Sequence, residues 1–140
     1  KTLVFIASSA YLMPATAQNT AQESSACPAG WAMTDKQLQG EWVGSINHQS
    51  ESVRLVLGPH PEWQGMVKGS VERAGSASSH PMVGDLNNGT ITLEESADGT
   101  HITGTWLGEA SPASCGQEIR GSFSASEDDA PQDFVIQKQP

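Results

Sequence analysis

Residue types that carry catalysis in other proteins are present in this chain, but their spacing does not fit the usual chemistry. The histidines form no His-x-His or His-x-x-x-His pair, so a metal site has little support. Serine is abundant, yet no Gly-x-Ser-x-Gly motif provides a nucleophile. We therefore expect a protein that is not an enzyme and that has no metal site and no cofactor. The four histidines are His48, His60, His80 and His101.

The adjacent carboxylates Glu94 and Glu95 fall in a segment that predicts a β-strand. Neighbouring strand residues point to opposite faces, so these two side chains are unable to share a substrate. Glu95 is expected to point inward at the rim of the sheet, beside Ile102. A solvated rim side chain is favoured there over a catalytic acid.

Two pairs of residues are candidates for binding. Residues 58–63, Gly-Pro-His-Pro-Glu-Trp, join two predicted strands and present His60 and Trp63 among stiff prolines. Aromatic side chains on rigid loops are good anchors for a protein partner. The alternative is that Trp63 folds over a barrel end as a lid and meets no partner. Trp42 and Trp106 form the second pair, because they are expected to line an interior that would bind an apolar ligand.

The two cysteines, Cys27 and Cys115, lie 88 positions apart. An even number of cysteines behind a secretory signal predicts a disulfide. The alternative is a lipidated Cys27, but the preceding Ser-Ser-Ala lacks the usual leucine and lies too far past the apolar region.

The 140 residues are expected to form one domain behind two N-terminal segments. Residues 1–17 combine a lysine, an apolar run and a small-x-small site, which indicates a signal peptide and a periplasmic or secreted protein. Residues 18–33 are expected to be an arm, and residues 34–140 a β-barrel. The net charge is −9, and removal of the signal takes away one lysine, giving −10. Such an acidic domain is expected to bind neither nucleic acid nor, after cleavage, a membrane.

One pattern, apolar-x-Gly-x-apolar, occurs five times and indicates how the chain folds. At a period of two, the glycine and its apolar neighbours share one strand face. Glycine weakens a strand interior, so its repeated presence predicts tight curvature or space for a bulky neighbour. The copies are residues 38–42, 67–71, 82–86, 102–106 and 119–123.

Turn residues separate eight predicted strands, and no helical period follows residue 40. A capping box at Thr34 and Gln37 predicts one helical turn before the first strand. We expect an all-β, eight-stranded antiparallel up-and-down barrel, with a two-layer β-sandwich as the alternative. The expected strands are residues 40–46, 52–57, 64–72, 81–86, 90–95, 101–108, 117–124 and 133–138.

Two Asx-Gly turns predict the register of the central strands. The turn at Asn88 and Gly89 pairs Leu86 with Ile91. A two-residue turn at Asp98 and Gly99 would pair Glu95 with Ile102, Leu93 with Gly104 and Ile91 with Trp106. The inner face is then expected to hold Trp42, Ile46, Val53, Leu55, Val67, Val71, Leu86, Ile91, Leu93, Ile102, Trp106, Ile119, Phe123, Phe134 and Ile136.

Residues 38–42, Leu-Gln-Gly-Glu-Trp, resemble the opening Gly-x-Trp strand of the calycin-type barrels, namely the lipocalins, the avidins and the bacterial inhibitors of secreted metalloproteases. Residues 102–106, Ile-Thr-Gly-Thr-Trp, are similar to a later avidin strand. The resemblance covers the strand pattern from residue 38 to about residue 123 and implies a calycin-like barrel.

This chain departs from both families in its functional positions. Residues 45–48, Ser-Ile-Asn-His, stand where avidins hold the Asn and Ser that bind biotin, and the avidins' tryptophan-rich wall is not recognisable, so biotin binding is not expected. The inhibitors insert an N-terminal arm into the protease cleft, and residues 18–33 are compatible with that role. Their disulfide, however, lies within the barrel strands, whereas Cys27 precedes them.

These observations predict a non-catalytic extracytoplasmic binding protein. Its partner would be a secreted protein, which it binds or inhibits through the arm or the loop of His60 and Trp63. The alternative is a carrier that holds a small apolar ligand inside the barrel.

Overall fold

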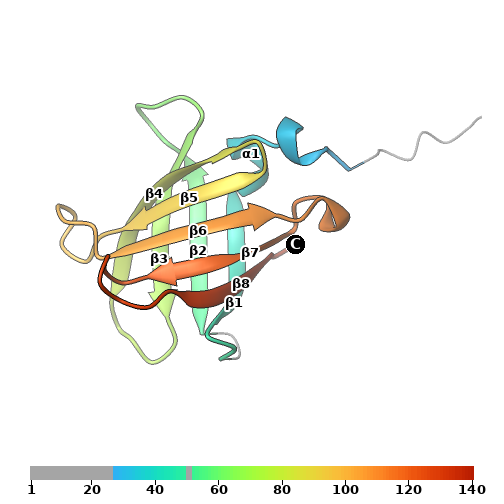
Figure 1. Ribbon diagram of the computed structural model, residues 1–140. Helices are drawn as coiled ribbons and strands as arrows, with labels where there is room; N and C mark the ends of the chain where they lie inside the picture. The colour runs from blue at the N-terminus through green and yellow to red at the C-terminus, as the bar shows by residue number, and fades with distance from the viewer. Residues whose placement is uncertain (1–26, 50–51) are drawn as a thin grey trace, which may run out of the picture.

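The computed structural model describes residues 27–49 and 52–140, which form a closed antiparallel barrel (Figure 1). Each strand pairs with the next along the chain, and β8 returns to β1. The predicted eight-stranded up-and-down barrel is confirmed, and the sandwich alternative is wrong, because the pairing of β1 with β8 closes the sheet. The strands are β1 (Gly40–Ile46), β2 (Val53–Pro59), β3 (Met66–Arg73), β4 (Ser79–Asn87), β5 (Thr90–Glu95), β6 (Gly104–Ala110), β7 (Glu118–Ser124) and β8 (Gln132–Lys138).

The two ends of the barrel differ. Four connections, β1–β2, β3–β4, β5–β6 and β7–β8, gather at one end, which we call the open end. The other three connections lie at the opposite end together with residues 27–39, and we call this the capped end (Figure 1). The expected signal peptide, residues 1–17, and residues 18–26 of the expected arm lie outside the described residues.

The capped end is covered by two short helical segments, η1 (Gly30–Ala32) and α1 (Asp35–Leu38). The predicted capping box starts α1: the Thr34 amide donates to Gln37 Oε1 at 2.7 Å, and Thr34 Oγ1 accepts from the amide of Lys36. This single turn delivers Leu38, which is fully buried, onto β2, β3 and β4. Within the described part of the chain, no helix has the length and apolar character needed to cross a membrane.

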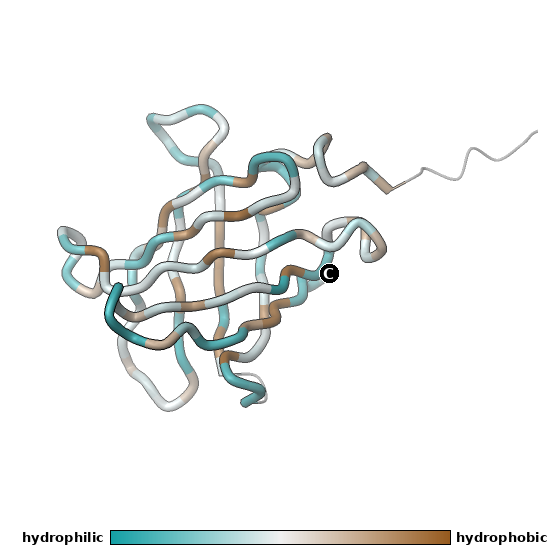
Figure 2. The backbone as a smooth tube through the Cα atoms, viewed as in Figure 1, coloured by the Kyte–Doolittle hydropathy of each residue, from teal (hydrophilic) through white to brown (hydrophobic). Residues whose placement is uncertain are grey.

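Apolar residues alternate with polar ones along the strands, as Figure 2 shows. Every residue expected on the inner face is buried except Ile102, which is 60% exposed. The tryptophan rings fill much of the interior: Trp106 packs against Phe123 and Phe134, with ring centroids 5.0 and 4.9 Å away. The barrel interior is therefore occupied by its own side chains.

The glycines of the repeated pattern allow the strands to approach one another on the inner side. A Cβ on Gly69, Gly84 or Gly121 would overlap a backbone carbonyl oxygen of the adjacent strand, so a larger residue would force these strands apart. Gly104 serves the second purpose expected of these residues, because its Cβ would lie 2.6 Å from the Phe123 ring and 2.7 Å from Glu95 Cγ. Both tight curvature and space for bulky neighbours account for the pattern.

The register prediction is confirmed at one turn and wrong at the other. Leu86 pairs with Ile91 across the Asn88–Gly89 turn, as expected. Between β5 and β6, however, Glu95 pairs with Gly104 and Leu93 with Trp106, a shift of two residues.

The shift arises because Asp98 builds a longer loop instead of a two-residue turn. One carboxylate oxygen of Asp98 accepts from the amides of Thr100 and His101, both at 2.8 Å. Hydrogen bonds from the His101 amide and side chain hold the pKa of Asp98 well below its usual range. Ile102 consequently belongs to the loop and is exposed, while the even shift leaves the other inward residues on the same face.

The close approach of the strands at glycine generates a stability prediction. We expect Gly121→Ala to lower the free energy of unfolding by about 3 kcal/mol, because the new methyl group would overlap the Leu107 carbonyl oxygen. The matched control is Gly58→Ala, whose Cβ would meet only the Lys68 carbonyl oxygen at 3.9 Å. That change is expected to stay within about 0.5 kcal/mol of the wild type. Urea unfolding measures both, and equal losses at the two positions would contradict the account.

Candidate functional site

The predicted pair Trp42 and Trp106 lies inside the barrel, and both side chains are fully buried. Trp42 Nε1 donates to the Leu38 carbonyl oxygen at 2.8 Å, and Trp106 Nε1 donates to Glu95 Oε2 at 3.1 Å. Both indole N–H groups therefore have protein partners, as buried tryptophans require. An apolar ligand would have to displace these rings to enter the interior.

The predicted pair His60 and Trp63 lies in the β2–β3 connection at the capped end. The two rings stack, with centroids 4.5 Å apart and planes 12° from parallel. His60 Nδ1 accepts from the amides of Glu62 and Trp63, each at 3.1 Å, and the His60 amide donates to the Met66 carbonyl oxygen. These contacts fix the loop while Trp63 remains 55% exposed. The loop thus presents a firmly held aromatic surface to solvent.

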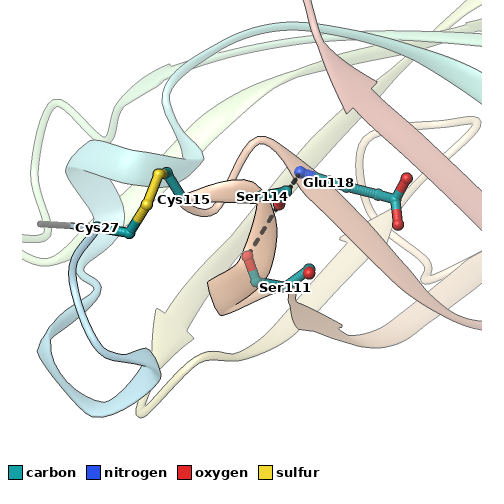
Figure 3. The surroundings of a disulfide bond; sticks show 5 residues. All are labelled: Cys27, Ser111, Ser114, Cys115 and Glu118. Atoms are coloured by element: carbon teal, nitrogen blue, oxygen red, sulfur yellow. Dashed lines mark hydrogen bonds between the residues drawn. A yellow bond between two sulfur atoms is a disulfide. The ribbon is translucent and has the colours of Figure 1, made fainter.

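The predicted disulfide joins Cys27 to Cys115 and fastens the N-terminal segment to the β6–β7 connection (Figure 3). Cys115 follows the short helix η2 (Pro112–Ser114), whose Ser114 hydroxyl donates to the Ser111 carbonyl oxygen and accepts from the Glu118 amide. The disulfide is compatible with an oxidising compartment such as the periplasm or the cell exterior. The capped end therefore carries a covalent anchor for the chain that enters it.

A charged group that the sequence placed in solvent is instead buried near the open end. Glu95, expected at the rim beside Ile102, is only 2% exposed. Its Oε1 accepts from Arg73 Nη2 at 2.8 Å, and its Oε2 accepts from Trp106 Nε1 at 3.1 Å. Glu95 is buried because the shifted strand β6 places Gly104 opposite it and leaves space for its side chain.

Arg73 and His80 were missed by the sequence reasoning. Arg73 shares the parity of Val67 and Val71 in β3, and that period was the signal that it points inward. Its guanidinium carbon lies 5.2 Å from the Phe123 ring centroid, and its side chain is 29% exposed. His80 Nδ1 lies 3.7 Å from Glu95 Oε1 and, among the described residues, is buried without a hydrogen-bond partner. His80 shares the parity of Met82, Gly84 and Leu86 in β4, so the same period of two marked it as an inward residue.

A hollow of about 360 Å³ opens beside Arg73 at the open end. It lies above the filled interior, and Phe123 forms part of its wall. In the described ranges, no group of three His, Cys, Asp or Glu side chains is placed to hold a metal ion. The described hollow is lined by Ile46, Asn47, Gln49, Ser52, Val53, Arg73, Ala74, Phe123 and Gln132.

Removal of the disulfide tests how strongly it holds the capped end. We expect replacement of Cys27 and Cys115 by serine to lower the free energy of unfolding by about 2–4 kcal/mol, because the unfolded chain loses a long closed loop. Urea unfolding with and without reductant measures the change. Reductant should destabilise the wild type to the same extent and leave the serine variant unaffected; an unchanged wild type would contradict the prediction.

Removal of the buried carboxylate tests the ion pair. We expect Glu95→Ala to cost about 3 kcal/mol, because Arg73 and Trp106 would lose their acceptor in a buried setting. Glu95→Gln should cost less, since its amide oxygen still accepts from one of the two donors. The control is Glu94→Ala on the outer face, expected within about 0.5 kcal/mol of the wild type. Chemical denaturation measures the free energy of unfolding of each variant. Similar losses of stability in Glu94→Ala and Glu95→Ala would contradict a stabilising role for the ion pair.

Three features of the described residues bear on function: a filled interior, an aromatic loop at the capped end and a hollow of mixed polar and apolar lining at the open end. The closed barrel is compatible with a calycin-like architecture. Neither a scan against protein-family models nor a search of curated proteins gives a match for this chain.

Proposed function

We propose that the protein is a non-catalytic binding protein of an extracytoplasmic compartment that recognises a secreted protein through the loop of His60 and Trp63. The observation that carries the proposal is the Trp63 ring, 55% exposed and yet stacked on His60 at 4.5 Å. Inhibition of a secreted enzyme is one form that such recognition would take.

The loop is preorganised for binding. Two backbone amides donate to His60 Nδ1, and the Met66 amide donates to the Trp63 carbonyl oxygen. A side chain that is already ordered loses little conformational entropy when it meets a partner. Tryptophan is also among the residues that contribute most to protein interfaces. A rigid, exposed tryptophan therefore combines large contact area with a low ordering cost.

The barrel interior favours this proposal over the carrier alternative. Trp42, Trp106 and Phe134 are buried and occupy the space in which an apolar ligand would lie. The buried Glu95 also supports a non-catalytic role, because each of its two oxygens already accepts a hydrogen bond from a protein donor.

Site-specific photo-cross-linking tests the proposal. A photoreactive phenylalanine analogue is placed at position 63, and in a control at position 107, where Leu107 is 50% exposed on β6. Each protein is irradiated in the extracytoplasmic protein fraction of the cells that produce the chain. We expect a discrete cross-linked partner at position 63 and none at position 107, because only the loop is proposed to meet the partner.

Competition gives the second arm of this experiment. Unlabelled wild-type protein should suppress the cross-link, whereas Trp63→Ala should compete about tenfold less well or worse, since an interface tryptophan contributes about 2 kcal/mol or more. Leu107→Ala should compete as well as the wild type. Equal labelling at positions 63 and 107, or equal competition by Trp63→Ala and the wild type, would reject the proposal.

A further inference from the structure

The hollow at the open end contains a positively charged side chain, Arg73, although the protein as a whole is acidic. The chain carries a net charge of −9, yet among the described residues that line the hollow Arg73 is the only charged one. Glu95, its partner, does not line the hollow and lies behind the guanidinium group. The described lining of the hollow itself therefore offers a cation and no carboxylate, and Asp129 lines an adjoining hollow that shares Phe123 and Gln132.

Arg73 is held in place from two sides. Glu95 Oε1 accepts from its Nη2 at 2.8 Å, and the Phe123 ring lies beneath its guanidinium carbon at 5.2 Å. A guanidinium group has five N–H donors in a fixed plane, and the described residues accept from one nitrogen only. Glu95 and Phe123 thus orient Arg73 while donors on its other nitrogens remain for a further acceptor.

The burial of Glu95 indicates that the pair does more than stabilise the fold. Burying two charges costs desolvation energy, and apolar residues of similar size often serve a fold equally well. Glu95 is 2% exposed, whereas the Arg73 side chain is 29% exposed on the side of the hollow. This asymmetry is the arrangement expected when a buried carboxylate positions an arginine for a ligand.

The remaining lining fits a small amphipathic molecule. Asn47, Gln49 and Gln132 supply amide groups, and Ile46 and Val53 continue the apolar wall that Phe123 begins. The volume of about 360 Å³ lies at the lower end of the range for small-molecule sites, roughly 300–1,000 Å³. The hollow is therefore large enough for a short acyl chain and too small for a bulky lipid.

We propose that the open-end hollow binds a small monocarboxylate with a short apolar chain, its carboxylate on Arg73 and its chain against Phe123, Ile46 and Val53. The site is separate from the aromatic loop, which lies at the opposite end of the barrel, and it does not depend on the interior opening. Arg73 is the binding residue, and Glu95 is a positioning residue.

Fluorine NMR of protein labelled with 5-fluorotryptophan tests the proposal, with hexanoate as the probe. Trp106 reports on the site because its Nε1 donates to the same carboxylate that holds Arg73. We expect hexanoate to shift the Trp106 resonance until the site is saturated. The affinity for hexanoate should be at least about tenfold higher than the affinity for hexanamide or hexylamine, since either analogue loses the charge-assisted hydrogen bond. The labelled residues are Trp31, Trp42, Trp63 and Trp106.

Two variants separate ligand binding from a purely structural role. Glu95→Gln keeps an amide oxygen that accepts from Arg73, so the cation stays positioned, and it removes the charge that offsets that cation. Hexanoate should therefore bind this variant at least as tightly as the wild type. The double variant Arg73→Gln, Glu95→Gln keeps a neutral hydrogen-bonding pair, which avoids an unpaired buried charge, and should bind hexanoate about tenfold more weakly or worse. Thermal unfolding of both variants confirms that they are folded.

Three results would overturn the proposal. The first is a Trp106 resonance that hexanoate does not shift saturably. The second is equal affinity for hexanoate and hexanamide, which would indicate apolar adsorption or a neutral polar ligand. The third is wild-type affinity in the folded double variant, which would assign the ion pair to stability alone.

Discussion

The close approach of adjacent strands at inward-facing glycines is the constraint on which the barrel depends. Where a Cβ would stand on Gly69, Gly84 or Gly121, the structure has the carbonyl oxygen of the next strand. Glycine normally weakens a strand, but at these positions any larger residue would push two backbones apart. The curvature gained in this way lets eight short strands close on themselves around a narrow interior.

A narrow interior filled with indole and phenyl rings leaves little space for other molecules, and the two features proposed here for recognition lie at the two ends. At the capped end, the disulfide and a short helix hold the entering chain, and the neighbouring β2–β3 loop displays Trp63. At the open end, the pair of Glu95 and Arg73 borders a small hollow. The barrel separates these two regions, so each is able to bind a different partner.

The period of two along the strands predicted an antiparallel all-β fold and every inward residue except Ile102, and the Asn-Gly turn predicted the β4–β5 hairpin, because both are local properties. The period alone did not distinguish the barrel from a sandwich, because closure depends on the distant pairing of β1 with β8. The β5–β6 loop was mispredicted because Asp98 binds amides further along the chain, a contact that propensity does not encode. The ion pair was missed for a related reason. Arg73 and Glu95 lie 22 positions apart, and only the true register reveals that their side chains meet. The stacking of His60 on Trp63 was equally beyond a reading of the loop's composition.

Closure of the sheet also determines what happens when the chain is incomplete. Strands β1 and β8 are the first and last strands of the barrel, and each satisfies the backbone hydrogen bonds that the other would leave open. A chain that ended before Gln132 would lack β8, and both β1 and β7 would become unpaired edges. Such edges readily recruit strands from other molecules. Protection against strand pairing with other molecules is thus a property of the finished ring, and proteolytic removal of its C-terminal strand would expose two edges on which such molecules could assemble.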